Sequence, residues 1–277
     1  MEKSNPSRTI KTVDLHVDAP WKWWKYGIDN QTELHIDVPV FAIYLPDAIR
    51  DHVYAVREQI EWCTDKGVKN LGIEGGRLVN INLLPDLRKL GVRYITLMHN
   101  FDNEIGGSSL GLGSTGTGHK VGLSDRGIIL IKAMEHVGIV PDISHANDNT
   151  AWDVISYSNG PVIASHSGCQ GLVDHPRNLS DELIQYIALR DGVVGVPFVR
   201  KFLGWPKYTV ADHIDYIVQL VGIDHVAIGS DIDGAVTVAE APEWRGVVVD
   251  TLLERGYSVD DVAAMAGGNA TRVLGLQ

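Results

Sequence analysis

Side chains that can bind a metal ion or transfer a proton recur just after short apolar runs of this sequence. They comprise four of the eleven histidines and three acidic residues: His16, His99, His145 and His166, with Asp18, Glu74 and Asp231. Neutral imidazoles and ionised carboxylates are ligands of divalent cations, and a cation also relieves the repulsion among clustered acids. If the fold brings these residues together, the pattern predicts a metal centre.

The local sequence around several of these residues strengthens this prediction. His16 and Asp18 are separated by one residue, so an extended backbone points both side chains to the same side. Glu74 lies between an apolar run and two glycines, where a purely structural acid is unusual, although a solvated loop residue is the alternative. Two successive runs end in Ser-His, at His145 and His166. One such histidine is more often a core or capping residue, but four of them beside three acids favour metal binding.

Eight short β-rich runs separated by helical patterns must position these residues. The runs cover residues 12–16, 40–45, 70–74, 93–99, 139–145, 161–166, 193–198 and 225–231. The helical patterns cover residues 47–66, 124–138, 147–158, 180–190, 210–222 and 246–256. The strand ends recur roughly every 30 residues, the length of one β-α unit. We therefore predict an α/β fold with a parallel sheet, a (β/α)8 barrel, with an open doubly wound sheet as the alternative.

A barrel of this kind gives the strand ends a common location. The carboxyl ends of all strands meet at one face, where active sites of such barrels are built. Residues as far apart in sequence as His16 and Asp231 would then converge at one mouth.

Composition and charge restrict the remaining possibilities. The 277 residues are 44% hydrophobic and 21% charged, which is ordinary for a globular protein. A net charge of −11, from 24 basic and 35 acidic residues, disfavours nucleic acid and anionic membranes as partners. Only two cysteines, a polar start and the lack of a long apolar run lead us to expect a cytoplasmic protein without a membrane anchor. No linker-like segment divides the chain, so we expect residues 1–277 to form one domain.

Two other features have more than one interpretation. The glycine-rich residues 106–118 follow the fourth run and predict either a flap at the mouth or a surface loop. Trp21, Trp23 and Trp24 either wall a pocket or pack the first loop onto the barrel. The other seven histidines are interpreted as ordinary surface residues: His35, His52, His119, His136, His175, His213 and His225.

The order of these motifs along the chain resembles the membrane dipeptidase (renal dipeptidase) family of zinc metallopeptidases. The stretches that carry the resemblance are DLHVDAP at 14–20, GIEGG at 72–76, LGVRYITLMHN at 90–100, DISHA at 142–146, PVIASHSGCQGLVDHPRNLSD at 161–181, DHIDYIVQLVGIDHVAIGSDIDG at 212–234 and GGNATRVLG at 267–275. They span nearly the whole chain and follow the family's order.

This resemblance implies a TIM barrel of the metal-dependent hydrolase type that holds two zinc ions (Zn2+) per chain. His16 and Asp18 would bind one ion, and His145 and His166 would bind the other. Glu74 would bridge the two ions.

The resemblance also implies a substrate and a reaction. His99 would lie beside the reacting carbonyl, Arg177 would bind the substrate carboxylate, and Asp231 would be the acid and base. The implied reaction is hydrolysis of a dipeptide by a hydroxide shared between the metal ions. Whether a D-residue is accepted at the C-terminal position stays open.

Some features depart from the family's pattern, and two alternatives stay open. Arg77 stands where a histidine is expected after Glu-Gly-Gly, and the chain is shorter than expected, which bears on substrate range and on whether a homodimer forms. One alternative is another amidohydrolase-type reaction, such as that of a lactonase, deaminase or amidase. Asp18 in place of a second histidine, together with Arg177, disfavours it. The other is a barrel that binds a peptide without catalysis, which the complete ligand set and Asp231 disfavour.

Overall fold

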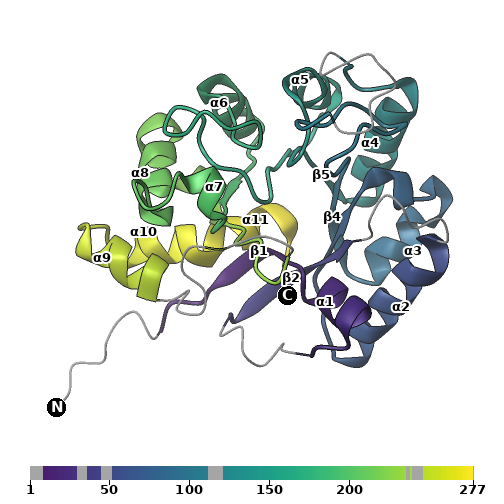
Figure 1. The fold of residues 1–277 in the computed structure, drawn as a ribbon, viewed down its shortest axis with the longest axis horizontal. Coiled ribbons are helices and arrows are strands. Elements are labelled where there is room, and N and C mark those ends of the chain that lie inside the picture. The colour runs from purple at the N-terminus through teal and green to yellow at the C-terminus, as the bar shows by residue number, and fades with distance from the viewer. Residues whose placement is uncertain are drawn as a thin grey trace.

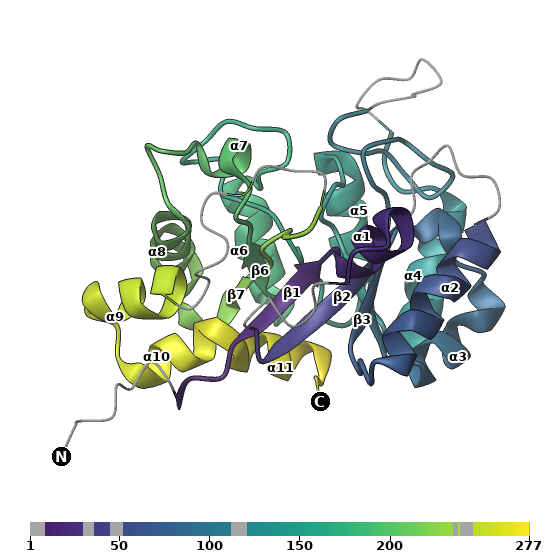
Figure 2. The ribbon, with the colours of Figure 1, turned by 60° about the horizontal axis from the view of Figure 1, so that its bottom comes forward.

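A parallel sheet forms the centre of the molecule. The computed structural model describes residues 9–29, 36–44, 52–111, 121–234, 238 and 246–276. Its strands within these residues are β1 (Val13–Val17), β2 (Val38–Tyr44), β3 (Leu71–Glu74), β4 (Val92–Thr96), β5 (Val140–Asp142), β6 (Val194–Val196) and β7 (Val226–Ile228). β1 to β5 are hydrogen-bonded in chain order, and β6 pairs with β7. Figure 2 shows these strands in the middle of the molecule with helices on the outside.

The last part of the sheet returns to the first strand and closes a barrel. Val17 of β1 forms a parallel bridge with Ile232, which follows β7. The Asp18 N–H donates to the Ile232 carbonyl at 2.9 Å, and the Asp231 N–H donates to the His16 carbonyl at 3.1 Å. The predicted (β/α)8 barrel is therefore confirmed, and the open sheet that was its alternative is excluded.

The sixth predicted strand, residues 161–166, is not a regular strand. Only Ile163 and Ala164 form bridges, to Asp142 of β5 and to Val194 of β6. These bridges still connect the two sheets, so eight segments follow one another around the barrel in chain order. The prediction was right about the position of this segment and wrong about its regularity.

Side chains of its neighbours replace the regular ladder in this segment. The Ser165 N–H donates to Asp142 Oδ1 at 2.8 Å, and the His166 N–H donates to Ser144 Oγ at 3.0 Å. On the other side the backbone of Gly229 comes so close that a Cβ there would lie 1.7 Å from the Ser165 carbonyl oxygen. The segment is therefore fixed by side chains and by a close backbone contact, and it carries His166 to the mouth of the barrel.

One apolar cluster fills the barrel beneath its mouth. Its members include Val13 and Leu15 of β1, Val40 of β2, Tyr94 of β4 and Ile163. None of these five side chains is more than 1% exposed. Because they come from segments all around the sheet, they occupy the interior, and the polar site is built on top of them.

Helices cover the outside of the strands (Figure 1). The α-helices are α1 (Ala19–Tyr26), α2 (His52–Asp65), α3 (Leu84–Lys89), α4 (Asp125–Val137), α5 (Asp148–Tyr157), α6 (Asp181–Leu189), α7 (Arg200–Leu203), α8 (Val210–Val221), α9 (Thr251–Glu254), α10 (Val259–Ala263) and α11 (Asn269–Leu274). Short 3-10 turns cover Gly76–Leu78, Ile81–Leu83 and Ile223–His225, and π-helical turns cover Gly246–Asp250 and Ala264–Gly268. Within the described ranges, no helix has both the length and the apolar character that crossing a membrane requires.

The longer helices follow the sequence predictions closely. The predicted range 124–138 is confirmed, because Ser124 Oγ accepts from the Gly127 N–H at the start of α4 and Gly138 ends the helix with a φ of 75°. The helix predicted over residues 246–256 is instead a π-helical turn followed by α9. Helices α1, α3, α7, α10 and α11 were not predicted, because each has eight residues or fewer and shows too little periodicity.

Candidate metal centre and active site

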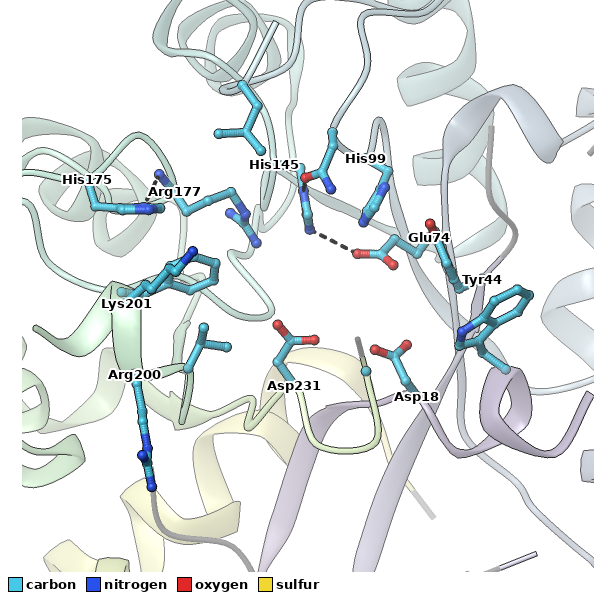
Figure 3. Close-up of a pocket in the computed structure, with 16 residues that line it drawn as sticks. Asp18, Tyr44, Glu74, His99, His145, His175, Arg177, Arg200, Lys201 and Asp231 are labelled. Carbon is cyan, nitrogen blue, oxygen red and sulfur yellow. Dashed lines mark hydrogen bonds and ion pairs between the residues drawn. The ribbon is translucent and has the colours of Figure 1, made fainter. Parts of the chain in front are cut away.

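A cavity of about 590 Å³ opens at the end of the barrel where the strands finish. Six of the predicted site residues line it: Asp18, Glu74, His99, His145, Arg177 and Asp231. The other two, His16 and His166, have no exposed surface. Figure 3 shows the carboxylates of Glu74, Asp18 and Asp231 facing the same space as the His145 imidazole. The predicted convergence of these side chains is therefore confirmed.

Glu74 lies at the centre of the imidazoles. Its Oε1 atom is 3.1 Å from His145 Nε2 and 3.5 Å from His166 Nε2. The same oxygen is 3.8 Å from His16 Nε2. His16 Nε2 is in turn 3.6 Å from Asp18 Oδ1, so the His-x-Asp pair does point to one side. One carboxylate oxygen thus lies next to both predicted pairs of ligands.

A hydrogen-bond chain fixes the proton of His16. Its Nδ1 atom lies 2.9 Å from the Tyr94 hydroxyl, and that hydroxyl donates its only proton to the Leu15 carbonyl at 2.8 Å. Burial raises the pKa of the Tyr94 hydroxyl well above its usual value, so the hydroxyl keeps this proton. Nδ1 of His16 must therefore be the donor, which leaves a lone pair on Nε2 directed at Glu74.

A second chain orients His166 in the same way. Its Nδ1 atom lies 2.8 Å from Ser165 Oγ, and Ser165 Oγ donates to Asp142 Oδ2 at 2.6 Å. Thr96 Oγ1 also donates to this Asp142 oxygen, at 2.6 Å. Because the Ser165 proton is used on the carboxylate, His166 Nδ1 carries the hydrogen and Nε2 carries the lone pair.

The third imidazole has the same arrangement and completes a metal-binding set. His145 Nδ1 lies 3.1 Å from the amide oxygen of Asn100, which can only accept. The Nε2 atoms of His145 and His166 are then 2.9 Å apart with lone pairs on both. His16 Nε2 and Asp18 Oδ1 are buried and have no hydrogen-bond partner among the described residues. A cation between these atoms satisfies them all, so the donor set fits divalent metal binding.

Two of the site residues, His145 and Asp231, have unusual backbone conformations. His145 has a φ of 68° and Asp231 a φ of 61°, both in the left-handed region. Residues other than glycine rarely adopt this conformation, and it is concentrated at functional sites. Here it turns both side chains from the ends of their strands into the cavity.

Burial keeps the imidazoles neutral. It lowers the pKa of His16 and of His99 to about 3, and the Arg177 guanidinium contributes in the same direction. For the same two reasons the pKa values of His145 and His166 lie well below the usual range, with the other imidazoles adding to the effect. Neutral imidazoles are the form that ligates a metal ion.

Burial raises the pKa values of the carboxyls of Asp18 and Asp231, whereas it lowers those of the imidazoles. It raises the pKa of Asp18 well above its usual value, and the negative charges of Glu74 and Asp231 raise it further. Burial also raises the pKa of Asp231 to about 6, although Arg177 opposes this. A group with this pKa can both accept and release a proton near neutral pH.

These shifts predict how the stability of the metal-free protein depends on pH. Four imidazoles have folded-state pKa values below their unfolded value, so acidification protonates the unfolded chain first and favours unfolding below about pH 6.5. The carboxyls of Asp18 and Asp231 have raised pKa values, so acidification stabilises the folded state through them. Because four imidazoles oppose two carboxyls, the net effect of acidification is a loss of stability. In the presence of a chelator, the free energy of unfolding measured with urea should fall between pH 7 and pH 5. Equal or greater stability at pH 5 would contradict this account.

Arg177 brings a buried positive charge to the cavity. It is 3% exposed, donates to the His166 carbonyl at 3.2 Å and lies over the Phe202 ring at 5.2 Å. Burial lowers its pKa to about 10, so the guanidinium is still charged at neutral pH. Its Nε atom is buried without a hydrogen-bond partner among the described residues. A carboxylate in the cavity is the chemical group that such a guanidinium binds best.

Two of the histidines interpreted as surface residues have other environments. His175 lines the cavity, and its Nδ1 accepts from the Arg177 N–H at 3.1 Å. His213 is fully buried, where Nδ1 accepts from the Cys169 N–H and Nε2 donates to the Leu203 carbonyl. The helical pattern over 210–222 contained this signal, because His213 falls on the buried stripe of α8.

The remaining histidines are away from the site or outside the described part. His136 is exposed, and His225 is half-buried with Nδ1 donating to the Gly192 carbonyl. His35 and His119 lie outside the described residues, as does the side chain of His52.

Both interpretations of the tryptophans hold, for different residues. Trp21 lines the cavity, whereas Trp23 stacks on Trp62 with ring centroids 5.1 Å apart.

Of the glycine-rich stretch, residues 106–111 are described, and Leu110 among them lines the cavity. Sequence reasoning missed Tyr44, whose ring lies 4.7 Å from that of His99, because the last residue of an apolar strand carries no special signal.

Several proteins that are similar to this chain in sequence bear the name dipeptidase. Dipeptidase verJ of Clonostachys rogersoniana is 35% identical over 212 residues, which are 74% of this chain and 54% of that protein. An uncharacterized dipeptidase of Schizosaccharomyces pombe is 31% identical over 275 residues, which are 95% of this chain and 66% of that protein. The chain thus spans about half to two thirds of the length of these relatives.

Solved structures share the fold, and a family model matches most of the chain. A metallo peptidase from Rhodobacter sphaeroides, liganded with a phosphinate mimic of the dipeptide L-Ala-D-Ala, has a TM-score of 0.81 and 22% identity over 97% of this chain and 99% of its own. The probable dipeptidase PvdM from Pseudomonas aeruginosa has a TM-score of 0.81 and 21% identity over 98% of this chain and 96% of its own. The model of the membrane dipeptidase family matches residues 52–276. The chain therefore belongs to the membrane dipeptidase family, peptidase family M19.

Proposed function

We propose that this protein is a binuclear zinc dipeptidase, with residues 1–277 as one catalytic domain. The observation that carries the proposal is the position of Glu74 Oε1, within 3.8 Å of three imidazole Nε2 atoms whose lone pairs face it. Family membership and the dipeptidase relatives support the reaction class. The solved relative that binds a mimic of L-Ala-D-Ala supports dipeptides as substrates, including those with a C-terminal D-residue.

The ligand set divides into two halves that share one acid. His16 and Asp18 would hold one zinc ion, and His145 and His166 would hold the other. Glu74 lies beside both pairs and would contact both ions. When bound, the ions would lower the pKa of water to near neutral and polarise the scissile carbonyl.

Asp231 is the residue best suited to move the proton. Asp231 is 8% exposed and lines the cavity, and burial raises the pKa of its carboxyl to about 6. It would take a proton from the attacking water and deliver it to the departing amine. The hydrogen bond from its N–H to the His16 carbonyl keeps it beside the metal ligands.

His99 and Arg177 would orient the substrate. The neutral His99 imidazole has one N–H, which would donate to the carbonyl oxygen as negative charge develops there. Arg177 would bind the carboxylate of the C-terminal residue. A guanidinium held this close to the reacting group restricts substrates to one residue after the scissile bond.

Assays with matched substrates test this function. Zinc-loaded protein should hydrolyse L-Ala-L-Ala or L-Ala-D-Ala, and it should act much more slowly on the tripeptide and on the dipeptide amide. A chelator should abolish the activity and added zinc should restore it. Hydrolysis of lactones without hydrolysis of any dipeptide would contradict the proposal, as would turnover that resists chelation.

Metal affinity should depend on Asp142, although this residue does not face the cavity. In Asp142→Asn the amide would donate to Ser165 Oγ, the serine proton would turn to His166 Nδ1, and Nε2 would carry a hydrogen in place of its lone pair. We expect zinc affinity to fall about 10- to 100-fold, as for other residues that orient metal ligands. Competition with a chromophoric chelator measures this directly, without an activity assay.

Asp153→Asn provides the matched control for that experiment. Asp153 also accepts a backbone hydrogen bond, from the Leu123 N–H at 2.8 Å, but it does not contact the ligand set. Its replacement should leave zinc affinity unchanged. Equal affinity in Asp142→Asn and wild type would mean that the serine does not control the His166 proton.

A further inference from the structure

Positive charge gathers on one side of the cavity. The described acidic residues that line the cavity are Asp18, Glu74 and Asp231, all at the metal centre. Figure 3 shows the cations Arg177 and Lys201, with the His175 ring beside them, on the other side of the cavity from Glu74 and Asp18. The cavity is therefore polarised, with acids around the metal-binding atoms and cations where the rest of a substrate must lie.

Lys201 is the cation of this group without an assigned role. It belongs to α7 at the mouth, and its side chain is exposed. Among the described residues it has no ion-pair or hydrogen-bond partner. Its charge acts on His175. Burial lowers the pKa of this histidine most, and the charges of Arg177 and then Lys201 lower it further. Lys201 thus adds positive potential beside Arg177, and the negative charge of Asp174, which also acts on His175, opposes it only in part.

The neighbouring Arg200 does not duplicate this position. Its Nε donates to the Val238 carbonyl at 3.1 Å, and Figure 3 shows its side chain running away from Arg177 and Asp231. Lys201 is therefore the side chain of α7 that can offer a charge to a molecule bound beside Arg177.

The covalent structure of a dipeptide determines which of its groups would lie near the Lys201 ammonium. The C-terminal carboxylate and the side chain of the last residue branch from the same carbon atom. If Arg177 holds the carboxylate, the side chain starts next to the guanidinium and extends into the region lined by His175 and Lys201. A second carboxylate there would offset the mutual repulsion of the cations.

We propose that Lys201 binds an acidic side chain of the C-terminal residue, so that dipeptides ending in aspartate or glutamate are the preferred substrates. This inference rests on the proposed dipeptidase function. It goes beyond that function by naming a substrate class and the residue that selects it.

Glutamate and glutamine provide a matched pair of substrates, because their side chains differ in charge but hardly in shape. The test compares kcat/KM of the zinc-loaded protein for Ala-Glu and Ala-Gln, with the C-terminal residue in each configuration. We expect Ala-Glu to be preferred about three- to fivefold, because solvent screens an ion pair with an exposed lysine. Using the ratio of two substrates on one enzyme preparation removes any effect of its active fraction.

Variants of Lys201 assign the preference to this side chain. In Lys201→Met the ratio should fall to near one, and in Lys201→Glu it should reverse, with Ala-Lys becoming a better substrate than Ala-Gln. Lys207→Met is the control, because Lys207 is also exposed but lies over the Tyr208 ring and does not line the cavity. It should keep the wild-type ratio.

The possible outcomes separate this inference from the function on which it rests. Hydrolysis of Ala-Gln and Ala-Glu at equal kcat/KM would overturn the inference and leave the dipeptidase function standing. A preference for Ala-Glu that persists in both Lys201 variants would also overturn it. Failure of the zinc-loaded protein to hydrolyse any dipeptide would overturn both.

Discussion

Replacement of Asp231 by asparagine should lower kcat about 10²- to 10⁴-fold, the usual contribution of a positioned acid-base group. The amide has the same shape and tolerates the left-handed φ of 61° at this position. It cannot take a proton from water or pass one to the leaving amine. Bound zinc, measured by atomic emission on the same sample, should stay at the wild-type level, because Asp231 belongs to neither half of the proposed ligand set.

Asp233→Asn is a close control for this experiment. Asp233 lies two residues further along the same loop and also has a left-handed φ, of 67°. Its carboxylate pairs with Lys22 Nζ at 2.6 Å and does not line the cavity. Its kcat should stay within about fivefold of wild type, because this carboxylate pairs with Lys22 and cannot reach a substrate in the cavity. If Asp231→Asn behaves like this control, another group transfers the proton.

Arg177→Met should raise KM for dipeptides about 100-fold while kcat changes much less. Removing one partner of a buried charge pair costs about 2–5 kcal/mol, and the carboxylate that Arg177 would bind is present in substrate and transition state alike. Methionine keeps an apolar contact with the Phe202 ring, over which the guanidinium lies at 5.2 Å. Steady-state kinetics with L-Ala-L-Ala and L-Ala-D-Ala measure the two parameters separately.

A substrate without the carboxylate identifies the cause of this effect. The dipeptide amide should be hydrolysed equally slowly by wild type and by Arg177→Met, since neither can form the ion pair. Arg190→Met is the matched protein control, because the Arg190 guanidinium also donates to a backbone carbonyl, that of Ile155 at 2.8 Å, but does not line the cavity. A KM unchanged by Arg177→Met would show that the carboxylate binds elsewhere.

The convergence of the site residues could be predicted because it depends on topology alone. Once the alternation of strands and helices indicates a parallel barrel, every strand end must lie at the same face. This is sufficient to bring Glu74, His145 and His166 within reach of each other, and Glu74 Oε1 is 3.1 and 3.5 Å from the two imidazoles. Residues that merely line the mouth, such as His175 and Tyr44, lacked such a signal and were missed.

The irregular sixth segment could not be predicted from its own residues. Residues 161–166 have the composition of a strand, but the N–H groups of Ser165 and His166 donate to the side chains of Asp142 and Ser144 in place of a neighbouring strand. These acceptors belong to the preceding β-α unit. Local propensity describes how a segment behaves alone, whereas here the neighbouring side chains decide the geometry.

Apolar periodicity and the residue types at the strand ends, both properties of neighbouring residues, were enough to predict the barrel, the order of its segments and the candidate metal ligands at its mouth. The protonation of those side chains was decided only in three dimensions. The Tyr94 hydroxyl that orients His16 is 78 positions away in the sequence, and the Asn100 amide that orients His145 is 45 positions away. Hydrogen bonds act over about 3 Å in space and are indifferent to separation along the chain. The set of lone pairs that fits a metal ion therefore exists only in the folded protein.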